Sequence, residues 1–425
     1  MTHFEKNDVL TDLNHGFRSG YSPETQLAVT IDDLAKRFDD GQQTDVVILD
    51  FSKAFDTVPH DRLLHKLNSY GIKGQLLSWI KTFLTTRKMR VVVDGEFSSE
   101  ADVISGVPQG TVLGPILFLV HINDLPECVS SSVRLFADDC LLYRSIKSIK
   151  DHEALQKDLT HLETWATKWG MKFNASKCYV LPLKKKTSYF YQLDNTILKE
   201  VTNNPYLGLN ISHDLKWSHH INSVCKKASS TLGFVRRNLQ NCPKETRLTA
   251  YISLVRSLLE YGASIWDPLD HKKDIDKLER IQRQAARFVT RDYRSREPGC
   301  VTKMLKELDL ATLQSRRRNL RLSFLFKIVV GLTPAIPPDK YLKPIQNKRK
   351  ITAKNFSDCV SKNIVEQYVT NNSRAFQIPP NKGSDQYKQS FFVRTIPEWN
   401  GLANQTVTAG SLDIFKTRLS SDSSQ

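Results

Sequence analysis

The chain lacks long apolar runs and paired cysteines. None of its hydrophobic stretches approaches the ~18 residues of a membrane-spanning helix, so we expect no membrane association. Its seven cysteines are scattered, without a Cys-x-x-Cys pair or a cysteine–histidine knuckle, which argues against a disulfide framework and a zinc site. These absences predict an intracellular protein of the cytoplasm or nucleus with reduced thiols.

The net charge of +16 is unevenly distributed along the 425 residues. Residues 1–211 carry 24 basic and 26 acidic side chains, whereas residues 212–330 carry 24 basic and only 12 acidic ones. A local basic excess attracts polyanions and makes their binding salt-dependent. With 40% apolar residues, a chain of this length is expected to fold into two or three domains.

Two adjacent acids interrupt an apolar stretch at Phe-Ala-Asp-Asp, residues 136–139. The apolar runs on both sides predict a hairpin with Asp138 and Asp139 at its tip. From these residues alone an ordinary turn is the better explanation, because Asp tolerates turn conformations.

A third acid changes this balance. Asp50 follows the apolar run of residues 46–49, which is typical of a strand buried on both faces. Three carboxylates on adjacent central strands would repel one another strongly unless cations lay between them. Two divalent ions about 3.5–4 Å apart are the usual solution, and they drive in-line phosphoryl transfer. Mg²⁺ suits such a site because it prefers carboxylate oxygens.

Three segments resemble ordered motifs of reverse transcriptases. They are Asp-Phe-Ser-Lys-Ala-Phe-Asp at 50–56, Ser-Gly-Val-Pro-Gln-Gly at 105–110 and the acidic pair at 136–139. The flanking residues are similar to non-LTR (LINE-type) retrotransposons of a jockey-like clade, and the likeness runs from about residue 13 to near residue 420. Examples of this flanking similarity are residues 15–18, 114–118, 122–126 and 206–208.

The resemblance implies an α+β right-hand polymerase that copies RNA into DNA. It places partial fingers and the palm in residues 1–211, a basic helical thumb and post-thumb in 212–333, and a linker with a C-terminal extension in 334–425. The first finger strands and an upstream endonuclease are not recognisable, so we expect an N-terminally truncated copy. An RNA template, a DNA primer and deoxynucleotides are the implied partners.

The resemblance also implies roles for individual residues. Asp50 and Asp138 would hold two Mg²⁺ ions, with Mn²⁺ as a substitute, and Asp139 would lie beside them. The carbonyl of Phe51 would complete one metal site. Phe55 would exclude a 2′-hydroxyl from the sugar pocket; the alternative is that it is only a core residue.

Three further residues are implied to contact the nucleotide. Gln109 and Gly110 would form the nucleotide-binding turn; the alternative is an ordinary loop leading into a helix, which Thr111 would cap. Lys177 would lie near the triphosphate and protonate the leaving pyrophosphate, although a single lysine is commonly a solvated surface group.

A basic amphipathic helix is predicted within residues 277–289. Its apolar positions are 278, 281, 285, 288 and 289, and its basic positions, on the opposite face, are Lys277, Arg280, Arg283 and Arg287. We interpret the basic face as a nucleic-acid contact of the thumb; the alternative is an ordinary solvated face. Further basic residues in the same segment support the first interpretation: 226–227, 236–237, 316–318 and Arg321.

Other elements follow from periodicity and turn residues. We predict helices over 63–83 and 153–169, and a strand over 89–93 that turns at Asp94-Gly95. Residues 184–186 are expected to form a loop and 339–390 a polar linker. The apolar residues near 391–399 are expected to dock onto the helical part. Arg18 is expected to be one of the few remaining cations of the fingers.

Two alternatives to an active polymerase remain open. One is a catalytically weak or inactive remnant that only binds RNA–DNA. The other is a metal-dependent nuclease using the same carboxylates, against which the Phe55 and Gln109 positions argue because a nuclease needs no nucleotide pocket.

Overall fold

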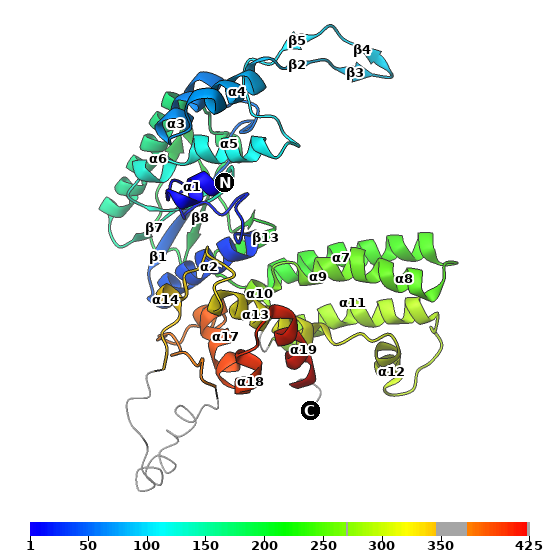
Figure 1. Cartoon of the computed structure of the whole chain (residues 1–425). Coiled ribbons are helices and arrows are strands. Elements are labelled where there is room, and N and C mark those ends of the chain that lie inside the picture. The colour runs from blue at the N-terminus through cyan, green and yellow to red at the C-terminus, as the bar shows by residue number, and fades with distance from the viewer. Residues whose placement is uncertain (269–270, 346–371, 423–425) are drawn as a thin grey trace. The chain divides into compact units, whose positions relative to one another are not determined.

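The computed structural model describes residues 1–268, 271–345 and 372–422, which form two compact units (Figure 1). The first unit comprises Met1–Gln26 and Asp40–Leu207, and the second comprises Leu27–Asp39 and Gly208–Gln425. Cys359 and residues 346–371 of the predicted linker lie outside the described residues.

A five-stranded sheet forms the centre of the first unit, in the order β11-β8-β1-β7-β6. Strand β1 is antiparallel to both of its neighbours, β7 is antiparallel to β6, and β11 is parallel to β8. The strands are β1 (Gln43–Leu49), β6 (Ser132–Phe136), β7 (Asp139–Ile146), β8 (Tyr179–Leu183) and β11 (Lys199–Glu200).

Strand β1 is central because its side chains can be buried on both faces. Val46, Val47 and Leu49 are at most 2% exposed, which confirms the expected buried strand before Asp50. Val47 and Leu49 belong to the main hydrophobic cluster, together with residues of α3, α5 and α6. One face of β1 therefore packs on a helical layer.

The helices of this layer are α3 (His60–Ser69), α5 (Leu113–Ile122) and α6 (Ile149–Trp169), and α3 also contacts α4 (Gly74–Thr85) (Figure 1). Helix α6 confirms the helix predicted over 153–169 and begins earlier, because Ser148 and Asp151 form a capping box. The single helix predicted over 63–83 is wrong. The chain breaks at Gly71, whose φ of +88° favours glycine, and two helices result.

A narrow antiparallel ribbon extends from α4, in which β2 pairs with β5 and β3 pairs with β4 (Figure 1). Its strands are β2 (Lys88–Met89), β3 (Val92–Val93), β4 (Glu96–Phe97) and β5 (Ala101–Asp102). Positive φ angles at Asp94 (50°) and Gly95 (89°) confirm the predicted tight hairpin turn between β3 and β4.

Short elements complete the first unit. They are α1 (Thr2–Lys6), η1 (Leu125–Cys128), η2 (Ala175–Lys177), β9 (Gln192–Leu193), β10 (Thr196–Ile197) and β12 (Asn203–Tyr206), while α2 (Pro23–Asp39) passes from the first unit into the second. The predicted loop at 184–186 is confirmed: Lys185 pairs with Glu200 at 2.6 Å, and Lys186 donates to the carbonyl of Gly41.

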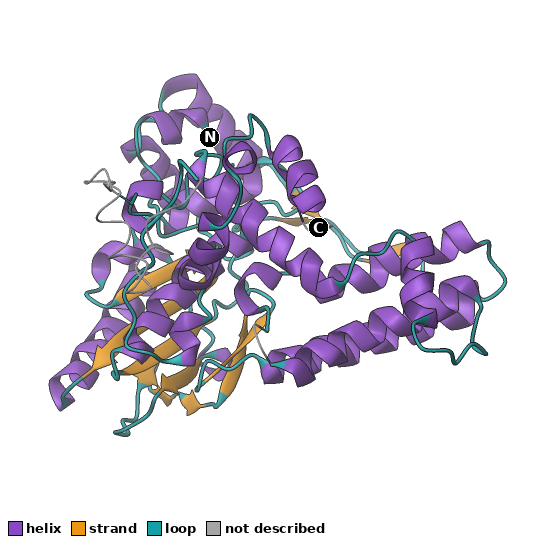
Figure 2. Ribbon diagram, turned by 90° about the horizontal axis from the view of Figure 1, so that it is seen from below, coloured by secondary structure: helices purple, strands orange, loops and turns teal. Residues whose placement is uncertain are grey.

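The second unit is almost entirely helical, as the pattern of residues 212–330 predicts. In it α7, α8 and α11 lie side by side as an elongated arm (Figures 1 and 2). Its elements are β13 (Leu209–Ser212), α7 (Ser218–Leu239), α8 (Lys244–Ala250), η3 (Tyr251–Arg256), α9 (Ser257–Glu260), α10 (Ala263–Trp266), α11 (Lys272–Thr290), α12 (Cys300–Glu307), α13 (Leu313–Val329), α14 (Pro338–Tyr341), α16 (Asp385–Lys388), α17 (Phe391–Asn400), α18 (Asn404–Val407) and α19 (Leu412–Asp422).

The C-terminal helices dock onto α13 through aromatic rings, as expected from the apolar residues near 391–399. Phe324 lies 4.8 Å from Phe391, and Phe326 stacks on Phe415 at 4.4 Å between ring centroids. Trp399 is fully buried in the same contact.

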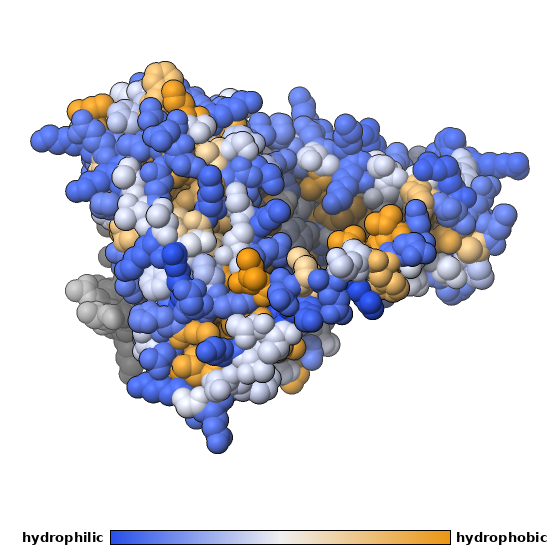
Figure 3. Space-filling model, turned by 90° about the horizontal axis from the view of Figure 1, so that it is seen from above, coloured by the Kyte–Doolittle hydropathy of each residue, from blue (hydrophilic) through white to orange (hydrophobic). Residues whose placement is uncertain are grey.

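The face seen in Figure 3 is mainly hydrophilic, with separate apolar patches. No helix in the described part of the chain is long and apolar enough to cross a membrane. The six cysteines within the described ranges are free thiols.

Candidate active site

The sheet register brings the three predicted carboxylates to one end of β1 and β7. Leu49 is paired with Cys140, so continuing the antiparallel register by one residue places Asp50 opposite Asp139. Phe136 pairs with Asp139 across the β6–β7 hairpin, which leaves Ala137 and Asp138 as its two-residue tip. The predicted hairpin is confirmed, but its tip lies one residue earlier than expected, because Asp139 is already the first paired residue of β7.

Strand alternation determines which face carries the acids. Leu49 and Cys140 both belong to the hydrophobic cluster beneath the helical layer. Because successive side chains of a strand point to opposite faces, Asp50 and Asp139 are directed away from that layer. Asp139 is exposed and Asp50 is half-buried, so the carboxylates are accessible at the open face of the sheet.

The carboxylates interact electrostatically. Burial raises the pKa of Asp138, and the neighbouring Asp50 carboxylate raises it further, while a backbone hydrogen bond opposes this. Although Asp139 is partly open to solvent, partial burial of its carboxyl group raises its pKa to about 6, and the Asp138 and Asp50 charges contribute to this rise. The charge of Asp50 thus makes ionisation of Asp138 and Asp139 more costly, and the charge of Asp138 adds to this effect at Asp139, as expected when like charges lie close together.

This donor set fits hard divalent cations. Carboxylate oxygens are the ligands that Mg²⁺ prefers, and a cation between the acids would reverse the rise in their pKa values. Among the described residues, no three His, Cys, Asp or Glu side chains are gathered closely enough to enclose an ion. Like charges without a cation repel, so the side chains of such a cluster are expected to spread apart.

Asn14 and Gly16 hold the acidic tip in place. Ala137 has a φ of +53°, a strained value for a residue with a side chain. The Asn14 side-chain oxygen accepts hydrogen bonds from the amides of Ala137 and Gly16, each at 3.0 Å. A Cβ added to Gly16 would lie 2.5 Å from the nitrogen of Ala137, so only glycine allows this approach. Sequence reasoning missed this support for Asp138.

A second segment fixes the backbone around Asp50. The carbonyl of Asp50 accepts from the amide of Asn174 at 2.8 Å, and Phe51 stacks on Phe173 with ring centroids 4.3 Å apart. Lys177, at the end of η2, belongs to this segment and is exposed. The structure thus brings the chain around Lys177 next to the chain around Asp50 and Phe51.

The nucleotide-binding turn predicted at 105–110 packs on the segment that follows Asp50. The amide of Val107 donates to the carbonyl of Phe55 at 2.8 Å, and Gln109 Nε2 donates to Asp56 Oδ1 at 3.0 Å. Gly110 has a φ of +76°. The structure therefore places the turn that carries Gln109 and Gly110 against the segment that carries Phe55.

Phe55 and Thr111 also make the contacts expected from the two alternative interpretations, in which Phe55 is a core residue and Thr111 caps a helix. The half-buried Phe55 ring stacks on Phe118 at 4.3 Å, and Phe17 meets its edge at 6.1 Å. The Thr111 hydroxyl accepts from the amide of Gly114 at 3.0 Å, in the first turn of α5. Each residue has a packing role whatever its role toward a ligand.

Comparison with known proteins identifies the domain that carries these residues. The family model described as "Reverse transcriptase (RNA-dependent DNA polymerase)" matches residues 4–211. Residues 4–211 therefore belong to the reverse transcriptase family. This match confirms the predicted α+β right-hand polymerase fold and includes all three acids.

The relatives of this reverse transcriptase domain include transposon proteins of Drosophila melanogaster. A probable RNA-directed DNA polymerase from transposon BS is 27% identical, covering 66% of this chain and 33% of the relative. The RNA-directed DNA polymerase from mobile element jockey is 26% identical, covering 66% and 32%. The resemblance to jockey-like elements is confirmed. The chain spans about a third of the length of these relatives.

A solved structure of Candida albicans telomerase is also similar. It is 12% identical, with a TM-score of 0.37, covering 81% of this chain and 58% of the telomerase chain.

The basic helix α11 has the predicted faces. Its apolar positions 278, 281, 285, 288 and 289 are all buried. Arg280 and Arg283 are exposed, and Arg283 lies 3.8 Å from Asp276. Lys277 donates to Asn222, and Arg287 donates to the carbonyls of Asp292 and Ser295. The open basic surface of this helix is thus centred on Arg280 and Arg283.

Two arginines counted toward the basic surface are buried. Arg317 and Arg321 are at most 1% exposed, and both pair with Asp267, at 2.7 and 2.6 Å. Their expected contribution to a nucleic-acid surface is therefore wrong, because both are held in the interior by Asp267, and Arg321 also pairs with Glu398 at 2.5 Å. Helical periodicity in α13 could not reveal a partner some fifty residues earlier.

Arg18 is likewise held within its own unit. It donates to the carbonyl of Thr11 at 2.8 Å and lies over the ring of Tyr21 at 4.0 Å. Its side chain is only 8% exposed.

Proposed function

We propose that this chain catalyses RNA-templated DNA synthesis. The observation that carries the proposal is the convergence of Asp50, Asp138 and Asp139 at one end of adjacent strands within a reverse transcriptase domain. In the proposed reaction the 3′-hydroxyl oxygen of a primer forms a bond to the α-phosphorus of a deoxynucleotide. The bond from this phosphorus to the bridging oxygen breaks, and pyrophosphate leaves. The hydroxyl proton is lost to solvent.

We propose that Asp50, Asp138 and Asp139, with the carbonyl of Phe51, hold two Mg²⁺ ions. When bound, such ions would neutralise charge on the attacking and leaving oxygens. Asp50 is fixed through its backbone to Asn174, and the tip with Asp138 is fixed to Asn14. The contribution of the protein is therefore positioning, which supplies much of the catalysis of phosphoryl transfer.

The neighbouring residues are assigned to the nucleotide. Phe55 would limit space at the sugar 2′ position, and its stacking on Phe118 holds the ring rigidly for that role. Gln109 and Gly110 would lie against the base pair being formed. Lys177 would donate a proton to the leaving pyrophosphate. The support is their arrangement around the segment that follows Asp50.

We propose that the second unit contributes the thumb, with residues 212–333 gripping an RNA–DNA duplex and residues 1–211 holding the palm and partial fingers. Exposed Arg280 and Arg283 on α11 support the assignment, since phosphate contacts supply most of the affinity in such complexes. RNA template, DNA primer and deoxynucleotides are the proposed partners.

Primer extension tests the proposal directly. The purified chain is given an annealed RNA template and DNA primer, deoxynucleotides and Mg²⁺, with Mn²⁺ in a parallel series. We expect extension by the parent chain and only background extension by Asp138→Asn. Asp94→Asn is the matched control, because Asp94 lies at the tip of another hairpin and is exposed.

Other outcomes would point to other functions. If the chain bound RNA–DNA in a salt-sensitive way but did not extend the primer, it would be a remnant that only binds nucleic acid and not an active polymerase. If the chain cleaved the template in a metal-dependent way, and if Asp138→Asn abolished this cleavage, the function would be that of a nuclease.

A further inference from the structure

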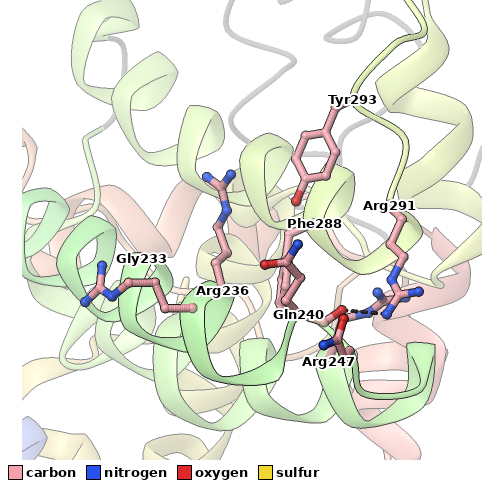
Figure 4. Close-up of a pocket in the computed structure, with 9 residues that line it drawn as sticks. Gly233, Arg236, Gln240, Arg247, Phe288, Arg291 and Tyr293 are labelled. Atoms are coloured by element: carbon pink, nitrogen blue, oxygen red, sulfur yellow. Dashed lines mark hydrogen bonds between the residues drawn. The ribbon is translucent and has the colours of Figure 1, made fainter.

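The arm of the second unit contains a pocket of about 640 Å³ that the proposed polymerase reaction does not use (Figure 4). It lies between the end of α7, the start of α8 and the end of α11. Four arginines and two aromatic residues dominate its lining: Arg236, Arg237, Arg247, Arg291, Phe288 and Tyr293. No acidic residue lines it within the described residues, so its charge is strongly positive.

Arg247 is the most informative residue of the pocket. Its side chain is only 5% exposed, yet its Nε and Nη1 have no hydrogen-bond partner among the described residues. Burying an unpaired guanidinium is costly, and such a group calls for an anion. Burial and the nearby Arg291 charge both lower the pKa of Arg247, and Glu245 opposes them only as the weakest influence.

The rim offers groups for the rest of a ligand. Arg236, Arg237 and Arg291 are exposed, and Arg291 is held by donating to the carbonyl of Gln240. Arg236 and Tyr293 extend toward each other across the pocket, with the guanidinium carbon 5.6 Å from the ring centroid (Figure 4). Tyr293 is 44% exposed, so much of its side chain is accessible to a ligand.

We propose that this pocket binds one nucleotide of a single-stranded nucleic-acid segment. Its phosphate is held by Arg247 and Arg291, and its base stacks on Tyr293 between the rim arginines. Guanidinium groups suit phosphate because their donors form a planar fork, and aromatic stacking accepts any base. The inference rests on the proposed function for its ligand, since a chain that copies RNA must handle unpaired strands.

Binding measured without catalysis separates this site from the polymerase site. The full chain carrying Asp138→Asn is titrated into a fluorescent ten-nucleotide uridine RNA without deoxynucleotides or primer. Arg247→Lys keeps the charge but loses the fork, and Tyr293→Leu loses the stacking face. We expect each to weaken binding about tenfold or more. Lys416→Gln, an exposed charge on α19, is the matched control and should leave the affinity unchanged.

The source of the phosphate is tested in parallel arms. An RNA with uncharged methylphosphonate linkages should bind equally weakly to the parent and to Arg247→Lys. Uridine 5′-monophosphate bound as tightly as the ten-nucleotide RNA would overturn the assignment to a strand. A phosphotyrosine peptide that bound more tightly than the RNA would replace nucleic acid by a protein ligand.

Stability controls keep the result interpretable. Thermal unfolding by circular dichroism identifies any variant that fails to fold; should Arg247→Lys do so, Arg236→Gln on the exposed rim replaces it. Unchanged RNA affinity in folded Arg236→Gln and Tyr293→Leu proteins would overturn the proposal. Weakened binding by the pocket variants, together with no primer extension by the parent chain, would support the pocket while refuting the polymerase.

Discussion

The substitution Asn14→Ala tests how the acidic tip is held. It removes one side-chain oxygen that accepts from two backbone amides, those of Ala137 and Gly16, each at 3.0 Å. Asn14 is only 3% exposed, so both amides would lose their partner in a place that water reaches poorly. A buried donor left unsatisfied costs about 1–3 kcal/mol, so we expect a loss of about 2–4 kcal/mol in the free energy of unfolding.

Urea unfolding followed by circular dichroism measures this loss. Asn7→Ala is the matched control, because Asn7 is exposed and bonds only within its own helical turn; it should change stability by less than about 0.5 kcal/mol. We also expect Asn14→Ala to extend primers more slowly at temperatures where it remains folded, because the strained turn at Ala137 is free to relax and move Asp138. Equal unfolding energies for the two variants would refute the reasoning.

Three further predictions follow from the same geometry. The pKa of about 6 at Asp139 lies above its ordinary value, so stability from its neutral form is present below about pH 4 and lost as the pH rises through 6. Bound Mg²⁺ needs the ionised form, so the Mg²⁺-induced rise in Tm should be larger at pH 7.5 than at pH 5, and Asp139→Asn should reduce this difference, while the raised pKa of Asp138 leaves part of it. Phe55→Val should raise the ratio of ribonucleotide to deoxynucleotide incorporation in primer extension, and an unchanged ratio would leave Phe55 a packing residue only. Asp267→Asn should cost about 3–5 kcal/mol in urea unfolding, because it leaves buried Arg317 and Arg321 without their shared charge; a loss below 1 kcal/mol would contradict that account.

Short sequence patterns correctly predicted those strands and turns that are determined by neighbouring residues. The apolar run before Asp50 predicted the central strand, and the acidic pair between two apolar runs predicted the hairpin, with its tip displaced by one residue. Both features depend on neighbouring residues: apolar side chains for burial on both faces, and Asp for the turn. The helix expected over 63–83 failed because the conformational freedom of Gly71 outweighed the continuous apolar pattern.

Contacts between distant residues could not be predicted in this way. Asn14 supports Ala137 across more than a hundred residues, and neither residue is unusual in its own neighbourhood. Arg317 looked like part of an exposed basic run, but Asp267 draws it into the interior. In both cases the role of the residue depends on its hydrogen-bond or ion-pair partner, and a single sequence does not show which distant residue that partner is.

The passage of α2 from the first unit into the second has a consequence for how the protein folds. Asp32 accepts from Ser390, and Asp39 accepts from the amide of Ser384, so residues more than 340 positions apart must meet. On a ribosome the first unit can collect most of its strands long before residue 390 is made, whereas Asp32 and Asp39 must wait for their partners until residues 384–390 are made. Contacts of such sequence separation form slowly, and the waiting helix is therefore the segment that we expect a chaperone to protect during synthesis.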